Sequence, residues 1–283
     1  MEGTAPTVGF PHMMSALVLA LVAAPMPAEA SNVLLDMSDP AGDDRGPGSY
    51  TYPIRPAYPP RVFDLRGFEV RLEGEQVVFT ATFASVIRRP SEQPRRTAAI
   101  EIALDNQIYV KHVDIYIRTA ERPGVQEGLP GRKIGFSQGW HRAVVMTPRP
   151  YLMRSLLKQW PHQDRVTVPD DLRAIGRRVT ARLPRSRFGS SPPQSWRFAV
   201  AVSGALWENQ FDSFPSAPQA YVPNALTMPV RPVADRRWFG GGDLPKAYPQ
   251  IIDLLAPTAA EQYRVLRAAR PGAPAMLPLL PSQ

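Results

Sequence analysis

The sequence predicts an all-β protein, an antiparallel β-sandwich with one short helix near its C-terminus. Apolar and polar residues alternate along several separate segments, as expected of strands that bury one face. Turn residues such as Glu73-Gly74-Glu75 separate these segments, which is typical of a sandwich or barrel of short strands. The 283-residue chain also holds 33 prolines, which suit loops and sheet edges rather than helix interiors.

The alternation places strands along most of the chain. It is clearest over 63–72, where Phe68, Val70 and Leu72 alternate with charged residues. A second segment, 76–83, follows directly after the turn. The other predicted strands are 99–104, 108–117, 142–147, 165–168, 178–183 and 196–203.

Two segments carry helix start signals instead. Residues 170–175 follow a proline, have acids in their first turn and stop at Gly176, which predicts a short helix. Thr258 and Glu261 have the spacing of a capping box, which predicts a helix over 258–266.

The N-terminus has the pattern of an export signal. An apolar run over 13–24 is followed by prolines and by Ala28-Glu29-Ala30. The run is too short for a membrane span and precedes a small-residue cleavage site, as in a signal peptide; a buried helix is the alternative. We therefore expect a signal peptide over 1–30 and one sandwich domain over 31–283, secreted or periplasmic and without a transmembrane span.

Charge narrows the range of partners. The formal net charge is +8, and loss of Glu2 and Glu29 with the leader would leave 33 basic against 23 acidic residues, or +10. Such a charge favours anionic polymers or an envelope surface. The arginines are scattered and no zinc or helix-turn-helix spacing accompanies them, so no nucleic-acid partner is expected. The chain has no cysteine, which excludes disulfides and thiolate metal sites.

An acidic, glycine-rich loop begins at Asp39. Asp39, Asp43 and Asp44 lie close together in sequence and a Gly-Pro-Gly break follows them, a composition that suits no helix or strand interior. Clustered carboxylates and loop carbonyls can supply the oxygen ligands of calcium, so these three residues are candidate ligands, with Asp64 as a fourth if the fold brings it near. The alternative is a turn whose carboxylates accept backbone N–H bonds.

Several short motifs follow this loop in a fixed order, and together they resemble the C-terminal domain family of glucodextranases. Each motif alone is weak, but the series covers about residues 32–280. The motifs are Ser49-Tyr50-Thr51-Tyr52-Pro53, Val62-Phe63-Asp64-Leu65, Leu129-Pro130-Gly131-Arg132 with Gly139-Trp140, Trp196-Arg197-Phe198, and Trp238-Phe239-Gly240 with Ile251-Ile252-Asp253.

The resemblance implies a DOMON-like β-sandwich related to family-nine carbohydrate-binding modules. It implies a secreted, non-catalytic module that binds carbohydrate or a cell-envelope polysaccharide. Two other functions stay open: a structural or interaction protein of the envelope without sugar specificity, and a haem-binding electron-transfer module. Where the family has an Asn-Pro-Trp-like segment this chain has the arginine-rich residues 88–96, which favours anionic glycans over a neutral glucan.

Aromatic side chains in predicted loops could stack on the apolar face of a sugar. Tryptophans beside strand patterns are expected in the core instead; these are Trp140, Trp196 and Trp238. The candidate ligand-binding residues are Trp160, Trp207, Tyr221 and Asp243.

Other chemistry has little support. His112 and Asp114 share one face of a predicted strand, so a surface pair is expected, or a metal site if another ligand joins them. His141 and Met146 could be haem ligands, but five positions apart on a strand they face opposite sides. The H-E-x-x-H and P-loop patterns are absent, and we expect no enzyme.

Overall fold

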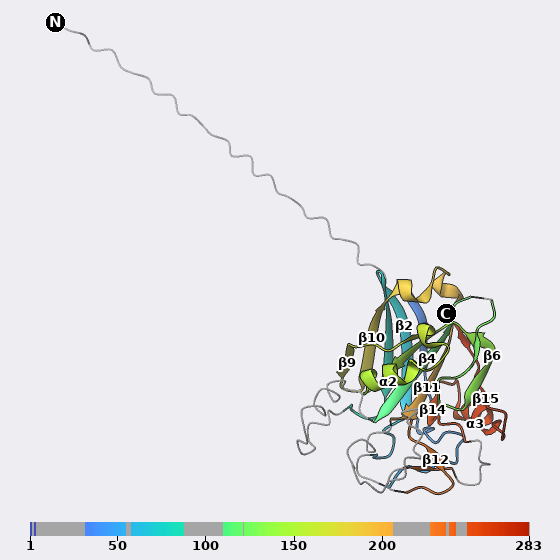
Figure 1. Ribbon diagram of the computed structural model, residues 1–283. Helices are drawn as coiled ribbons and strands as arrows, with labels where there is room; N and C mark the ends of the chain where they lie inside the picture. Colours follow the sequence, from blue (N-terminus) through green and yellow to red (C-terminus); the bar gives the residue numbers. More distant parts are fainter. Residues whose placement is uncertain are drawn as a thin grey trace. The chain divides into compact units, whose positions relative to one another are not determined.

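Two sheets lie face to face around a hydrophobic core (Figure 1). The structure, a computed structural model, describes residues 1, 3, 32–54, 58–87, 110–120, 122–205, 227–235, 238–241 and 248–282. Contacts within the chain group Ser31–Gln283 into one unit. The predicted all-β fold with a short C-terminal helix is confirmed.

The first sheet has the strand order β1-β2-β3-β10-β9, with all neighbours antiparallel. Phe68, Val70 and Phe79 on its inner face are buried, whereas Glu69 and Arg71 between them reach solvent. This alternation is typical of an antiparallel sheet with one solvated face. Its strands are β1 (Asn32–Ser38), β2 (Leu65–Glu73), β3 (Gln76–Phe83), β9 (Leu172–Ile175) and β10 (Arg178–Pro184).

The second sheet is buried on both faces. Its order is β14-β11-β4-β7-β8, with β16 beside β11, and every residue of β4 is buried. Its inner face meets the first sheet through residues such as Ile115 and Val200. Its strands are β4 (Lys111–Arg118), β7 (Arg142–Met146), β8 (Val166–Thr167), β11 (Arg197–Gly204), β14 (Asp253–Leu254) and β16 (Leu280–Pro281).

A third layer covers the outer face of the second sheet and forms a second core. Met153 and Leu157 from one helix and Leu266 from another pack there against Tyr116 and Trp140. The layer consists of β5 (Val125–Glu127), β6 (Ile134–Trp140), β15 (Ala275–Met276), α2 (Pro150–Leu157) and α3 (Ala259–Arg267). Short elements complete the fold: η2 (Gln163–Arg165), η3 (Arg185–Phe188), η4 (Pro193–Ser195), β12 (Val230–Arg231) and β13 (Phe239–Gly240).

The predicted strands that fall on described residues are present, with ends shifted by a few residues. The predicted strand at 99–104 lies outside the described residues. The predicted helix at 170–175 is wrong, because Leu172–Ile175 is β9 and pairs with β10. Six residues form only a marginal helix, whereas a hairpin through Gly176, which has a φ of +60°, adds a ladder of sheet hydrogen bonds.

Two elements are not anticipated from the alternation. Strand β6 contains Gly135 and Gly139, which weaken a strand pattern. Helix α2 has Pro150 in its first turn, a helix start signal, and buries Met153 and Leu157 one turn apart. Among the described helices, none is long and apolar enough to cross a membrane.

The predicted capping box of the C-terminal helix is present in part. Thr258 Oγ1 accepts a hydrogen bond of 3.2 Å from the Glu261 backbone N–H. Replacing Thr258 with alanine is expected to lower the free energy of unfolding by about 1 kcal/mol, since that N–H loses its partner. Urea unfolding measures this; Thr258→Ser should retain most of the stability, and equal losses in both variants would contradict a capping role.

Candidate functional site

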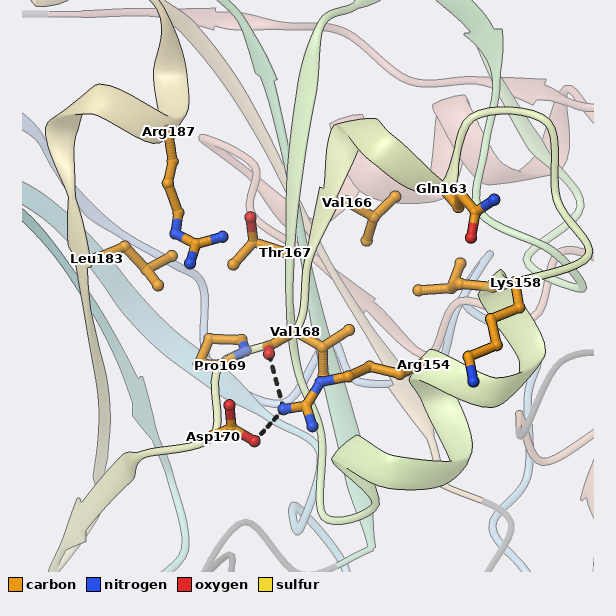
Figure 2. A pocket seen from close by; sticks show the side chains of 11 residues that line it. Arg154, Lys158, Gln163, Val166, Thr167, Val168, Pro169, Asp170, Leu183 and Arg187 are labelled. Carbon is orange, nitrogen blue, oxygen red and sulfur yellow. Dashed lines mark hydrogen bonds and ion pairs between the residues drawn. The ribbon is translucent and has the colours of Figure 1, made fainter.

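A basic surface groove lies between α2, β8 and the end of β10, and we name it the α2–β8 groove (Figure 2). Its volume is about 430 Å³. Apolar side chains and polar or charged side chains both line it. They are Leu157, Val166, Val168, Pro169 and Leu183, together with Arg154, Lys158, Gln163, Thr167, Asp170 and Arg187.

Cations outnumber carboxylates in this groove. Arg154 donates to the Val168 carbonyl at 3.1 Å and forms an ion pair with Asp170, which fixes its guanidinium (Figure 2). Lys158 and Arg187 are exposed, and no ion pair joins either side chain to another described residue. Their charges are therefore available to an anionic ligand.

A second recess of about 320 Å³ adjoins η3 and adds positive charge. Arg122 and Arg142 line it together with Phe188, the neighbour of Arg187. Arg142 Nε donates to the Arg187 carbonyl at 2.9 Å, so the backbone of η3 links the two recesses. Together they present five basic side chains around η3.

His141, one of the two candidate haem ligands, is held by the backbone. Its Nδ1 accepts from the Thr119 N–H at 3.0 Å and its Nε2 lies 3.0 Å from the Arg122 carbonyl, which defines the neutral tautomer protonated at Nε2. Burial and the nearby arginines lower its pKa. Met146 is buried between the two sheets. Neither side chain is poised to ligate haem.

Trp160 forms an aromatic ledge near the groove. Its ring stacks on buried Trp140, with centroids 5.9 Å apart and planes at 26°. Its Nε1 donates to Glu127 Oε1 at 3.1 Å, and its carbonyl accepts from the N–H of groove residue Gln163 at 3.2 Å. Trp160 keeps partial exposure, so it is the candidate ligand-binding aromatic that the structure places at a surface.

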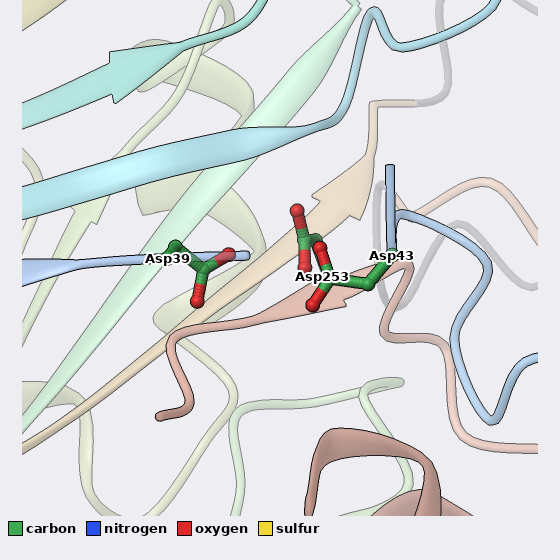
Figure 3. Close-up of side chains that lie close together, drawn as sticks. All are labelled: Asp39, Asp43 and Asp253. Atoms are coloured by element: carbon green, nitrogen blue, oxygen red, sulfur yellow. The ribbon is translucent and has the colours of Figure 1, made fainter. Parts of the chain in front are cut away.

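The acidic loop after β1 forms a different kind of site. The carboxylates of Asp39, Asp43 and Asp253 point toward one another, with ligand oxygens all within 4.8 Å (Figure 3). All three side chains are buried. Asp39 Oδ1 accepts from the Ala256 N–H at 2.9 Å, and Asp253 Oδ2 accepts from the Leu65 N–H at 2.7 Å. We name these three residues the carboxylate cluster.

Burial and mutual repulsion shift the titration of these acids. Burial, together with the charges of Asp43 and Asp64, raises the pKa of Asp39 to about 8. Burial likewise raises the pKa of Asp43 to about 6, and raises that of Asp253 above its ordinary value. Charge in the cluster is therefore unfavourable without a positive partner.

Asp44 is not a member of the cluster and has a separate hydrogen-bond partner. Its Oδ2 accepts a hydrogen bond from the Tyr52 hydroxyl, and burial raises its pKa to about 7. Lys111, on which the charge of Asp44 acts, is fully buried with its Nζ 4.0 Å from the centre of the Phe83 ring; burial lowers its pKa to about 7. Among the predicted calcium ligands, the structure thus brings Asp39 and Asp43 together with Asp253 rather than with Asp44.

Hydrogen bonds join the acidic loop to the C-terminal part of the chain. The Gly46 N–H donates to the Ile252 carbonyl at 2.7 Å, and Gln262 Nε2 donates to the Asp43 and Gly46 carbonyls. Gly46 has a φ of +56°, and a Cβ there would lie 2.4 Å from the Tyr50 ring. Glycine is required at this position on both grounds.

Three candidate ligand residues, Trp207, Tyr221 and Asp243, lie outside the described residues. Trp140, Trp196 and Trp238 are buried, as predicted. The expected surface pair at His112 and Asp114 is wrong: both are fully buried, and Asp114 binds the guanidinium of Arg132. The cause is the third layer, which covers the face of β4 that alternation alone would leave to solvent.

Sequence reasoning missed Asp253 and the groove residues Arg154, Lys158 and Arg187. Asp253 stands in an apolar stretch, Ile251 to Leu255, where an isolated buried carboxylate is itself a signal. The groove cations come from α2 and η3, elements that strand alternation does not show. Their convergence depends on tertiary structure.

A β-sandwich that presents a charged groove beside an aromatic ledge has the architecture of a binding module. Comparison with known families gives the same class, since residues 34–279 match the family described as the C-terminal, SLH-like binding module of glucodextranase. The chain belongs to this family. A search of curated proteins finds no match.

Proposed function

We propose that this protein is an exported, non-catalytic module that binds carbohydrate at the cell surface, and that its ligand is an anionic envelope polysaccharide. The observation that carries the proposal is the α2–β8 groove, in a chain whose family is a glucodextranase binding module. The leader-like residues 1–30 support export.

The groove suits an anionic sugar on chemical grounds. Arg154 is oriented by two contacts and can present its remaining N–H groups, while Lys158 and Arg187 add charge from the opposite walls. Guanidinium groups match the geometry of carboxylate and phosphate oxygens. Carboxylate- or phosphate-bearing polysaccharides are the class of ligand that uses these groups.

Trp160 supplies a second mode of contact. A ring held against Trp140 keeps one orientation and loses little entropy when a sugar packs on it. Because Gln163 joins Trp160 to the groove, one extended chain could meet both the ledge and the cations. Stacking adds recognition of sugar to attraction by charge.

The same groove supports a non-catalytic role. Glycoside hydrolysis needs two carboxyl groups across a cleft. Among the described residues that line the groove, Asp170 is the one carboxylate, and it is paired with Arg154.

Charge reversal in the groove should abolish much of the binding. Lys158→Glu/Arg187→Glu is expected to weaken binding to an anionic polysaccharide such as alginate at least about tenfold, or about 1.4 kcal/mol. Affinity electrophoresis and pull-down on insoluble polymer at low salt measure this, since surface attraction is screened within about 10 Å at 0.1 M salt.

The matched control is Arg177→Glu/Arg178→Glu, which makes the same change in net charge at the far, exposed end of β10. This variant should bind as the unmodified protein does. If both double variants lose binding equally, the polysaccharide is attracted by the net charge of the protein and not by the groove. If the unmodified protein holds no polysaccharide of any charge, the structural envelope role replaces this proposal. If polysaccharide binds and Trp160→Ala leaves that binding unchanged, Trp160 is not part of the site.

A further inference from the structure

We propose that Asp39, Asp43 and Asp253 bind one calcium ion, which ties the loop after β1 to strand β14. None of these residues lines the α2–β8 groove, so the inference goes beyond polysaccharide binding and does not depend on it.

The first argument is unmet bonding capacity. Asp39 Oδ2 and both oxygens of Asp43 are buried without a hydrogen-bond partner in the described chain, and Asp43 is 1% exposed. Buried polar atoms normally have partners, and an unpaired buried carboxylate is costly. Three such oxygens lie in one cluster, and an ionised carboxylate can only donate lone pairs. The expected partner is therefore a cation.

The second argument comes from outside the cluster. Asp64 is fully buried, and its Oδ2 accepts from the Gly42 N–H at 3.1 Å while its Oδ1 has no hydrogen-bond partner in the described chain. The charge of Asp64 acts on Asp39 and Asp43. Four buried acids close together would repel one another strongly, and a divalent cation would offset their charge.

Protein cations do not fill this role among the described residues. Arg66 lies 4.0 Å from Asp64 with a side chain 40% exposed, and no ion pair joins a basic side chain to a member of the cluster. Lys111 lies on the Phe83 ring and acts electrostatically on Asp44. The compensating charge is therefore expected from solution.

The donor set selects the ion. All donors are oxygen, with no histidine or cysteine among them, and hard cations prefer carboxylate and carbonyl oxygens. Calcium accepts irregular, partly bidentate geometry, whereas magnesium requires near-octahedral sites and keeps its waters. The Ala256 N–H holds Asp39 Oδ1, and the Leu65 and Leu254 N–H groups hold the two oxygens of Asp253, each of which keeps a second lone pair. Asp39 Oδ2 and both oxygens of Asp43 have no hydrogen-bond partner in the described chain and are the oxygens most open to an ion.

The test is thermal unfolding of the purified protein in EDTA and in excess calcium. Calcium at 100 times its Kd is expected to raise Tm by about 5 °C or more, and elemental analysis after gel filtration should find one calcium per chain. An unchanged Tm together with no bound calcium would overturn the proposal. Equal protection by magnesium at the same concentration would overturn the assignment to calcium.

Two matched variants locate the ion. Asp43→Asn should remove the calcium response and raise Tm in EDTA, because it deletes a buried charge whose oxygens accept no hydrogen bond from another described residue. Asp44→Asn changes a buried acid of the same loop that faces Tyr52, and it should keep the calcium response. A response lost in Asp44→Asn and kept in Asp43→Asn would refute this ligand set. Should Asp43→Asn not fold, the calcium content of the unmodified protein decides the question.

Discussion

Replacing Asp114 with alanine is expected to lower the free energy of unfolding by about 3–5 kcal/mol. The Asp114 carboxylate on β4 accepts hydrogen bonds of 2.7 Å and 3.1 Å from Nε and Nη2 of Arg132, and neither side chain has any solvent exposure. Without Asp114 the guanidinium would remain buried with an uncompensated charge. This loss is a large fraction of the stability of an ordinary domain.

The bonds around Arg132 explain why it cannot simply turn to solvent. Its Nη1 donates to Thr227 Oγ1 at 2.8 Å and to the Pro130 carbonyl at 3.2 Å, and its own carbonyl accepts from the Gln250 N–H. The side chain therefore joins β4, the loop before β6 and the segment before β12, while the backbone carbonyl of Arg132 holds the segment before β14. Its removal would loosen three parts of the fold together.

Two variants separate this effect from general fragility. Asp114→Leu/Arg132→Met removes both charges and should recover much of the stability, because apolar pairs often replace buried ion pairs without loss. Glu73→Gln, at the partly exposed ion pairs of Glu73 with Arg71 and Arg182, should cost at most about 1 kcal/mol. Denaturant unfolding measures all three, and similar losses for Asp114→Ala and Glu73→Gln would contradict the buried-pair argument.

The strands could be predicted from sequence because one face of the first sheet stays in solvent. Apolar and polar residues therefore alternate along segments such as Phe68 to Leu72. The same rule failed for Asp114. Strand β4 is buried on both faces, and the apolar run Ile115-Tyr116-Ile117 was the signal for it.

The candidate sites divide in the same way. Asp39 and Asp43 could be identified because a loop gathers them locally, with glycines that permit its turns. Asp253 could not, since only the pairing of β14 with β11 and the seating of the loop on the C-terminal segment bring it near. The groove depends on three elements that meet only in the folded chain, so its charges appear scattered in the sequence.

The last expected result concerns pH. With divalent cations removed by EDTA, the protein is expected to lose at least about 2 kcal/mol of stability between pH 5 and pH 7. In the folded chain, burial raises the pKa of Asp43 to about 6, of Asp44 to about 7 and of Asp39 to about 8. Unfolded aspartates titrate near pH 3.9, so the folded state binds more protons throughout this range. Stability then falls as the pH rises.

Two other groups, His141 and Lys111, make stability rise with pH. The net change of stability with pH depends on how large their effects are beside those of the acids. Burial lowers the pKa of His141, so its unfolded form takes up a proton below about pH 6.5 that the folded form does not. Burial lowers the pKa of Lys111 to about 7, which matters mainly above that pH. Near pH 5 the folded state holds about three more protons on carboxyl groups than the unfolded state, and about one fewer on histidine. Each proton of difference changes the free energy of unfolding by roughly 1.4 kcal/mol per pH unit, so the carboxyl groups determine the sign.

Calcium should reverse the trend, because ion binding requires the carboxylates to lose their protons. The difference in Tm between calcium and EDTA is therefore expected to widen from pH 5 to pH 7. Thermal melts at four pH values in each condition measure both curves. Asp43→Asn should flatten the EDTA curve, while exchange of the exposed Asp171 for asparagine should leave it unchanged. A Tm in EDTA that rises with pH would show that the acids of the loop are not held in the buried arrangement that defines the cluster.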